Sequence, residues 1–198
     1  DAFVSPVVDG YREGACGQAC TYDPEAAKAL FDEAGGIDGP VTLWFNSGAG
    51  HEEWMEAVAN LWRQNLGIEE IQFESLEFAD YLGRLDERTI EGPFRLGWAM
   101  DYPSAENYLT PIHATGASSN YTGYDNPEFN DLIAQGDQAE TQEDAIAAYN
   151  AAEDLLATDV PIIPMWFGQI QAVHSENVSN VVIDPFTRVD LAEVTVNG

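Results

Sequence analysis

The fold class is decided by residues 41–77, which read VTLWFNSGAGHEEWMEAVANLWRQNLGIEEIQFESLE. Apolar and polar side chains alternate at the start of this stretch, a period of two that predicts a strand. A glycine-rich turn follows, and Trp54, Val58 and Leu61 then recur at helical spacing before Gly67 ends the predicted helix. The final IQFESLE predicts a second strand. A strand, a helix and a strand in this order favour parallel pairing through a right-handed crossover.

The flanking segments extend the same alternation of strands and helices. On the N-terminal side, Asp23 and Pro24 are a typical cap and first position of a helix that Gly35 ends. On the C-terminal side, the apolar spacing predicts a helix from Phe78 to Leu85, and a third strand from Phe94 to Met100. This order of elements predicts an α/β layer with parallel pairing.

The rest of the chain has a different texture. Residues 102–123 are rich in Pro, Ser, Thr, Gly, Asn and Tyr, and long loops of this kind in compact domains tend to carry binding functions. Asn126 and Thr141 each cap a predicted helix. Beyond these helices the sequence predicts short β segments, with prolines that confine parts of them to edges or bends. These segments are Ile162 to Phe167, Gln169 to His174, Val178 to Ile183 and Ala192 to Val196.

The chain is strongly acidic, with 35 acidic and 7 basic side chains in 198 residues and a formal net charge of −28. Such a surface repels phosphate backbones and anionic lipids, so we expect no nucleic acid and no membrane surface as a partner. No apolar run approaches the roughly 20 residues of a membrane span, and residues 1–10 lack the pattern of a signal peptide. We therefore expect either a cytosolic protein or one whose export signal has been removed.

Cys16 and Cys20 are the two cysteines of the chain and lie in GACGQACTYDPE. No third cysteine or nearby histidine completes a tetrahedral site, so we expect no metal. A close pair in a glycine-rich loop can reach disulfide geometry, and no other cysteine competes for either partner. We expect a disulfide, which implies an oxidising, extracytoplasmic compartment, and two free thiols are the alternative.

Motifs of known enzyme classes are not found. The sequence has no G-x-S-x-G, no P-loop, no H-E-x-x-H and no EF-hand loop. His51, His113 and His174 are far apart, and we expect each of them on the surface or in a loop. Some pair among 35 carboxylates reaches glycosidase spacing by chance, so a carboxylate-dependent hydrolase stays only as an alternative from another class. We expect no catalytic residue and no cofactor.

The most informative segment for function is FRLGWAMDYPSAENYL, residues 94–109. On a strand, Arg95 and Asp101 share one face, and only small side chains lie between them on that face. Small side chains let the backbone of a ligand come close. Asp101 follows the predicted strand at its carboxyl end, where open α/β sheets bind ligands. The alternative is that Asp101 caps a short helix that starts near Ser104.

Four segments carry a resemblance that covers nearly the whole chain. They are YDPEAAKALFDEAG (22–35), GWAMDYPSAENYL (97–109), NYTGYDNPEFNDLI (120–133) and AAYNAAEDLLATDVPIIPMWF (147–167). In this order they resemble the C-terminal lobe of the extracellular solute-binding proteins of family 5, the dipeptide and oligopeptide receptors of ABC importers. The resemblance implies one lobe of a two-lobed, periplasmic-binding-protein-like α/β fold, with a mixed sheet flanked by helices. It further implies a ligand-binding lobe over residues 1–177 and tail strands over residues 178–198 that return to an N-terminal lobe.

The resemblance also implies roles for individual residues. Asp101 would bind the free α-amino group of a peptide, and Trp98 would contribute to the pocket wall. On an ideal strand Trp98 faces away from Asp101, so either the strand is irregular there or Trp98 is a core residue. We expect Arg95 to bind the ligand carboxylate, with pairing to a surface acid as the alternative. The other residues expected to line the site are Tyr102, Asn120 and Tyr121.

The function implied by the resemblance is the substrate-binding component of an ABC importer, without catalysis. Such a protein is extracytoplasmic, either periplasmic or tethered to the cell surface as a lipoprotein. It captures di- or oligopeptides and delivers them to the membrane permease. An oligosaccharide receptor of the same family is the alternative, with sugar hydroxyls in place of the peptide amine at Asp101.

Overall fold

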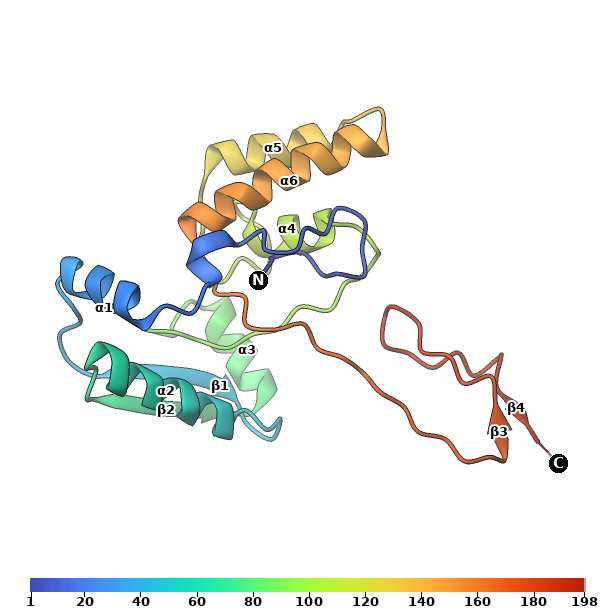
Figure 1. Cartoon of the computed structure of the whole chain (residues 1–198), viewed down its shortest axis with the longest axis horizontal. Coiled ribbons are helices and arrows are strands. Elements are labelled where there is room, and N and C mark those ends of the chain that lie inside the picture. The colour runs from blue at the N-terminus through green and yellow to red at the C-terminus, as the bar shows by residue number, and fades with distance from the viewer. Residues whose placement is uncertain (198) are drawn as a thin grey trace. The chain divides into compact units, whose positions relative to one another are not determined.

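The computed structural model describes residues 1–197, which form two compact units (Figure 1). One unit is Tyr22–Gly97, and the other combines Asp1–Thr21 with the chain from Trp98 onward. The division expected after residue 177, between a ligand-binding lobe and tail strands, stays a prediction. Residue 198, the end of the expected tail, lies outside the described residues.

The unit Tyr22–Gly97 is built on a parallel strand pair, as the sequence predicts. β1 (Val41–Asn46) pairs with β2 (Ile71–Leu76), and α2 (Glu52–Leu66) connects them. α1 (Pro24–Glu33) and α3 (Phe78–Asp86) complete the helices of this unit. The core of the unit joins the strands to α2, with Phe31 of α1 packed against it. Its buried members are Val41, Leu43, Phe45, Met55, Ala59, Ile68 and Ile71.

The third strand predicted from Phe94 to Met100 is reduced to a single residue. Phe94 forms an isolated parallel bridge with Trp44 of β1, in which Trp44 N donates to Pro93 O and Arg95 N donates to Trp44 O, both at 2.9 Å. The buried Tyr81 hydroxyl then donates to Arg95 O at 2.6 Å. No further bridge follows Phe94 in residues 95–100, so the expected strand over these residues is wrong.

The second unit is mainly helical. It contains a short 3-10 helix, η1 (Gly17–Cys20), and three α-helices, α4 (Glu106–His113), α5 (Pro127–Asp137) and α6 (Gln142–Asp159). α5 and α6 lie side by side (Figure 1). Their approach requires Gly136, because a Cβ at that position would lie 2.3 Å from the Tyr149 ring. The core of this unit collects Leu109, Phe129, Ile133, Ala152 and Leu156.

The helix boundaries expected from cap residues are confirmed. The side chains of Asp23, Asn126 and Thr141 accept hydrogen bonds from backbone N–H groups in the first turns of α1, α5 and α6. These bonds satisfy donors that have no partner inside the helix. At the other end of α2, Gly67 has φ 80°, a left-handed conformation that glycine adopts without steric cost.

The N-terminal segment Asp1–Thr21 packs against α6 through one buried carboxylate. Glu153, with 0% of its surface exposed, accepts hydrogen bonds from Phe3 N at 3.0 Å and Val4 N at 3.3 Å. Its second oxygen forms an ion pair with Arg12 at 3.0 Å. These bonds hold the N-terminal segment to a helix that lies far away in the sequence.

Cys16 and Cys20 are joined by a disulfide, with their Cα atoms 5.6 Å apart, and the Cys16 side chain is buried in the same core. We expect the protein isolated without reductant to contain this bond. Thiol titration after denaturation without reductant should therefore find no free sulfhydryl, and titration after reduction should find both cysteines. Two reactive thiols in the unreduced protein would contradict the expectation.

The C-terminal segment differs most from its predicted secondary structure. In the described residues, β3 (Val178–Ser179) pairs with β4 (Thr195–Val196) in antiparallel orientation, and Ile183 forms an isolated antiparallel bridge with Val189. Residues 161–174 contain no strand in the structure, because no described segment pairs with their backbone. Apolar side chains of this stretch are exposed instead, namely Ile163, Met165, Trp166, Phe167, Ile170 and Val173. No helix in the described part of the chain has the length and apolar character to cross a membrane.

Candidate functional site

The loop that precedes α4 is organised by one buried amide, the side chain of Asn107. Asn107 is 1% exposed and lies in the first turn of α4. Its Oδ1 accepts hydrogen bonds from Asp101 N at 2.8 Å and from Trp98 Nε1 at 3.2 Å. One side-chain oxygen thus holds two of the residues expected in the ligand site. Asn107 is not among the residues expected from the sequence. The one sequence feature that could have indicated its role is its position in the first helical turn after Asp101.

The Asp101 side chain is exposed, and in residues 1–197 no hydrogen bond or ion pair reaches its carboxylate. The alternative that Asp101 caps a helix is wrong. The N-cap of α4 is Ala105, and Ser104 Oγ accepts from Glu106 N at 3.2 Å instead. The start of α4 therefore does not use the Asp101 side chain as a hydrogen-bond acceptor. The charge of Asp101 is available to a ligand.

Trp98 and Asp101 are brought together although strand parity would separate them. The backbone from Trp98 to Asp101 is irregular, so the alternation of a strand does not apply. The Trp98 indole is half-buried, and its N–H donates to the same oxygen that binds the Asp101 backbone. The irregular backbone, one of the two expected possibilities, is the one that the structure contains.

Tyr102 lies beside Asp101 and is 46% exposed. Its hydroxyl donates a short hydrogen bond to Glu106 Oε2, which with partial burial raises the pKa of the Tyr102 phenol. The ring is anchored at its hydroxyl, and its exposed surface is free to contact a bound molecule. Contact between Tyr102 and a ligand stays a prediction.

Arg95 belongs to the other unit, Tyr22–Gly97. Its guanidinium donates to Asn46 Oδ1 at 3.3 Å, and burial lowers the Arg95 pKa. The alternative that Arg95 pairs with a surface acid is wrong, since the ion pairs found among residues 1–197 do not include it. The shared strand face with Asp101 is also wrong, because these residues form no strand, and contact with a ligand carboxylate stays a prediction.

Asn120 and Tyr121 occupy the loop between α4 and α5. The Asn120 side chain is 3% exposed, and its amide donates to the carbonyls of Ala114 at 3.0 Å and Tyr124 at 2.8 Å. Its Oδ1 accepts from Tyr124 N at 3.0 Å. These contacts favour a structural role for Asn120, which closes the loop, over the expected role in a pocket wall. The half-buried Tyr121 stays a predicted lining residue.

Two of the three histidines are buried, and for His113, which ends α4, this contradicts the expected surface or loop position. His113 is 1% exposed and makes edge contacts with the rings of Phe3, Tyr124 and Phe129. Both of its ring nitrogens lack a hydrogen-bond partner among the described residues, and burial lowers the His113 pKa to about 4. His51, 7% exposed, precedes α2, and burial with the nearby Arg95 charge lowers its pKa. Only His174 is exposed.

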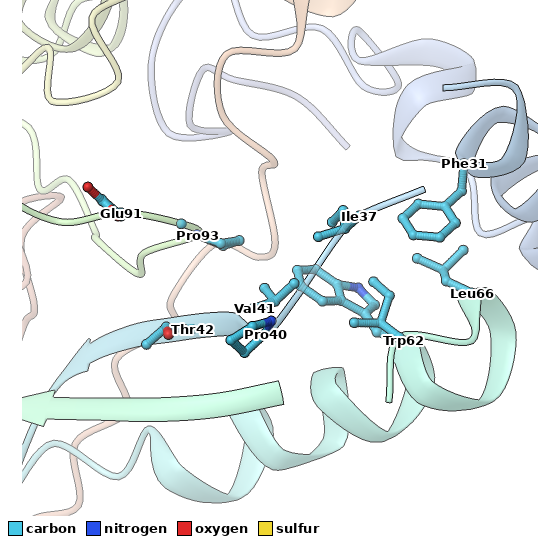
Figure 2. Close-up of a pocket in the computed structure, with 11 residues that line it drawn as sticks. Phe31, Ile37, Pro40, Val41, Thr42, Trp62, Leu66, Glu91 and Pro93 are labelled. Atoms are coloured by element: carbon cyan, nitrogen blue, oxygen red, sulfur yellow. The ribbon is translucent and has the colours of Figure 1, made fainter. Parts of the chain in front are cut away.

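A pocket lies elsewhere, in the unit Tyr22–Gly97. It has a volume of about 570 Å³ and lies where α1, β1 and the end of α2 meet (Figure 2). Phe31, Ile37, Trp62 and Leu66 lie at one end of it, and Glu91 and Pro93 at the other. None of the expected site residues lines this pocket. Within residues 1–197 no three His, Cys, Asp or Glu side chains gather as metal ligands.

Comparison with known proteins places the chain in a family. The sequence profile of the bacterial extracellular solute-binding proteins, family 5 (middle part), matches residues 1–120. The chain belongs to this family. The matched region includes the segment from Trp98 to Asn107, so the candidate site lies in the part that identifies the family-5 protein.

Curated relatives carry the names of peptide-binding proteins. Oligopeptide-binding protein OppA of Bacillus subtilis is 26% identical over 191 residues, which is 92% of this chain and 34% of that protein. Periplasmic murein peptide-binding protein MppA of Escherichia coli is 31% identical over 143 residues, 71% of this chain and 26% of that protein. The family-5 chain described here thus spans about a third or less of the length of these relatives.

Solved structures confirm the fold class, one lobe of a two-lobed periplasmic binding protein. Escherichia coli MppA, a murein tripeptide binding protein, is 26% identical with a TM-score of 0.69 over 82% of this chain and 33% of that one. Haemophilus influenzae OppA, in complex with the peptide RPPGFSPFR, is 25% identical with a TM-score of 0.75 over 88% and 35%. A protein described as AppA of Clostridium difficile reaches a TM-score of 0.84 over 99% of this chain at 21% identity, which supports the fold alone.

Proposed function

We propose that this chain is a ligand-binding lobe of the substrate-binding component of an ABC importer, which captures di- or oligopeptides outside the cell and delivers them to a membrane permease. Family membership and relatives named as peptide-binding proteins support this role. The role is binding without catalysis. The exposed Asp101 carboxylate offers a site for a charged group, and the sequence carries no G-x-S-x-G, P-loop, H-E-x-x-H or EF-hand motif.

The Asp101 carboxylate is the observation that carries this proposal. It is exposed, it has no partner within residues 1–197, and the Trp98 indole is held beside its backbone. An exposed carboxylate without a partner in the described residues matches the chemistry of a peptide α-ammonium group, which carries one positive charge and three N–H donors. An ion pair with the ligand would satisfy both charges.

The proposed location is outside the cytoplasm, in the periplasm or at the cell surface with a lipid anchor. The Cys16–Cys20 disulfide supports an oxidising compartment, in which such bonds form and persist. In the full-length protein we expect a second lobe to cover the ligand from the other side. The exposed apolar side chains of residues 161–174 are consistent with a surface that further protein covers.

Substitution of Asp101 by Asn tests the proposed function in the full-length protein. We expect Asp101→Asn to lower the affinity for a free-amine peptide by about tenfold or more, because a charge-assisted hydrogen bond contributes about 1.5 to 3 kcal/mol. The N-acetylated form of the same peptide should bind wild type and variant equally, since it has no ammonium group. Titration calorimetry with both peptides measures the difference.

Asp131→Asn is the matched control, because Asp131 is an exposed carboxylate on α5. This substitution changes the net charge equally and should leave both affinities unchanged. Equal loss for the free and acetylated peptides, or no loss at all, would remove the amine-binding role from Asp101. Binding of oligosaccharides in place of peptides would establish the alternative receptor class.

A further inference from the structure

Asn107 is built into the candidate site in a way that its burial alone does not require. A buried amide needs hydrogen-bond partners, but any polar groups that the fold brings near it can serve as such partners. Here both donors to Oδ1 come from the expected ligand-binding residues, the backbone of Asp101 and the indole of Trp98. The amide is contributed by α4, a regular element, whereas the donors lie on irregular backbone.

We infer that Asn107 is the positioning residue of the ligand-binding site, which sets the peptide-amine affinity by fixing the Asp101 carboxylate and the Trp98 ring relative to each other. This inference rests on the proposed function. Asn107 itself is 1% exposed and does not contact the ligand. It acts through the two residues that it holds.

The physical reason is the cost of ordering a loop when a ligand binds. An exposed carboxylate on an irregular segment samples many orientations, and binding must suppress all but one of them. The hydrogen bond from Asp101 N to Asn107 fixes the backbone that carries the carboxylate before the ligand arrives. The bond from Trp98 fixes the ring in the same way, so that both groups meet the ligand already in place.

An amide suits this position better than other side chains of similar size. Leucine has the same number of side-chain heavy atoms and the same branching at Cγ but no acceptor, so it would leave the N–H groups of Asp101 and Trp98 without a partner. Aspartate keeps an acceptor oxygen at the same place. These two substitutions therefore separate the shape of the side chain from its hydrogen bonds.

The test uses the full-length protein, with a free-amine peptide and its N-acetylated analogue as probes. We expect Asn107→Leu to lower the affinity for the free-amine peptide by about tenfold. The affinity for the acetylated peptide should change by less than about threefold. Asn107→Asp, which retains the acceptor, should keep the preference for the free amine. In the Asp101→Asn background, Asn107→Leu should cause no further loss of that preference, because the group through which it acts is gone.

A spectroscopic signal reports the positioning directly. The indole ¹H–¹⁵N resonance of Trp98, assigned with Trp98→Phe, should shift upfield and exchange faster with solvent in Asn107→Leu than in wild type. The signals of Trp44 and Trp62, which lie in the other unit, serve as internal controls. If Asn107→Leu does not fold, Asn107→Ser, whose hydroxyl is too short to reach both donors, replaces it with the same expectations.

The possible failures are distinguishable. If wild type does not discriminate the free-amine peptide from the acetylated one, the proposed function fails, and the role of Asn107 in amine affinity falls with it. If wild type discriminates and Asn107→Leu binds equally well, or loses both peptides alike, only the positioning role is overturned. Additive loss in the Asp101→Asn background would show that Asn107 acts independently of Asp101, which also overturns the inference.

Discussion

Replacing Glu153 by Leu should destabilise the unit that contains it by about 3 to 5 kcal/mol, the cost of breaking a buried ion pair by removing one partner. Glu153 is 0% exposed and accepts from Phe3 N, Val4 N and the Arg12 guanidinium. Leucine would leave two backbone donors in the core without an acceptor and Arg12 without its buried partner. Urea unfolding of the variant should show a lower midpoint than wild type.

Local measurements identify the cause of the loss. Backbone amides of Phe3 and Val4 should exchange with solvent much faster in Glu153→Leu, since these N–H groups donate to the missing carboxylate. Asp154→Asn is the matched control, because Asp154 pairs with the same Arg12 at 2.7 Å but is 62% exposed. Asp154→Asn should lower the free energy of unfolding by less than about 1 kcal/mol. Similar losses for both variants would contradict the role assigned to burial.

Acidification from pH 7 to pH 4 should destabilise the helical unit by about 3 kcal/mol through His113 alone. Burial lowers the His113 pKa from 6.5 to about 4, so the unfolded chain binds a proton in this range while the folded protein does not. The stabilising contribution is therefore complete above pH 6.5 and is lost as the pH falls toward about 4. About 2 kcal/mol of it should disappear by pH 5.

The groups around His113 offer no compensating charge. Its ring meets Phe3, Phe129 and Tyr124, and burial together with the bond to Asp159 raises the Tyr124 pKa to about 12, so the phenol is neutral throughout this range. The unfolding free energy of His113→Leu should accordingly decline less between pH 7 and pH 4 than that of wild type. His174→Asn, at the exposed histidine, should follow the wild-type curve. Parallel curves for wild type and His113→Leu would refute the prediction.

The candidate site could be predicted in part from its local sequence. The sequence points to Asp101 because a charge follows an apolar segment and precedes Pro103. The Asp101 side chain is exposed, although the strand expected before it does not form. The proximity of Asp101 and Trp98 could not be predicted from the sequence. It depends on an irregular backbone and on Asn107 Oδ1, which accepts hydrogen bonds from both residues. The expected shared strand face of Arg95 and Asp101 is wrong for the same reason, because the strand that would have joined them does not form.

The sequence by itself determined the parts of this protein that depend on neighbours along the chain. The strand, helix and strand of residues 41–77 follow from apolar periodicity, and the starts of α1, α5 and α6 follow from cap residues that bond within a turn. Such interactions join residues only a few positions apart, so each can be recognised in a short window. The same holds for Cys16 and Cys20, which lie 4 residues apart.

Only the tertiary structure decided the features that join distant residues. Glu153 binds Phe3 across 150 positions, Tyr81 donates to Arg95 O beside the bridge at Phe94, and His113 is enclosed by rings from three other segments. In each case a polar group is removed from water, and its partner, or the lack of one, depends on how the chain folds back on itself. A buried glutamate and an exposed one look the same in the sequence, and only folding determines which of them holds an N-terminal segment in place.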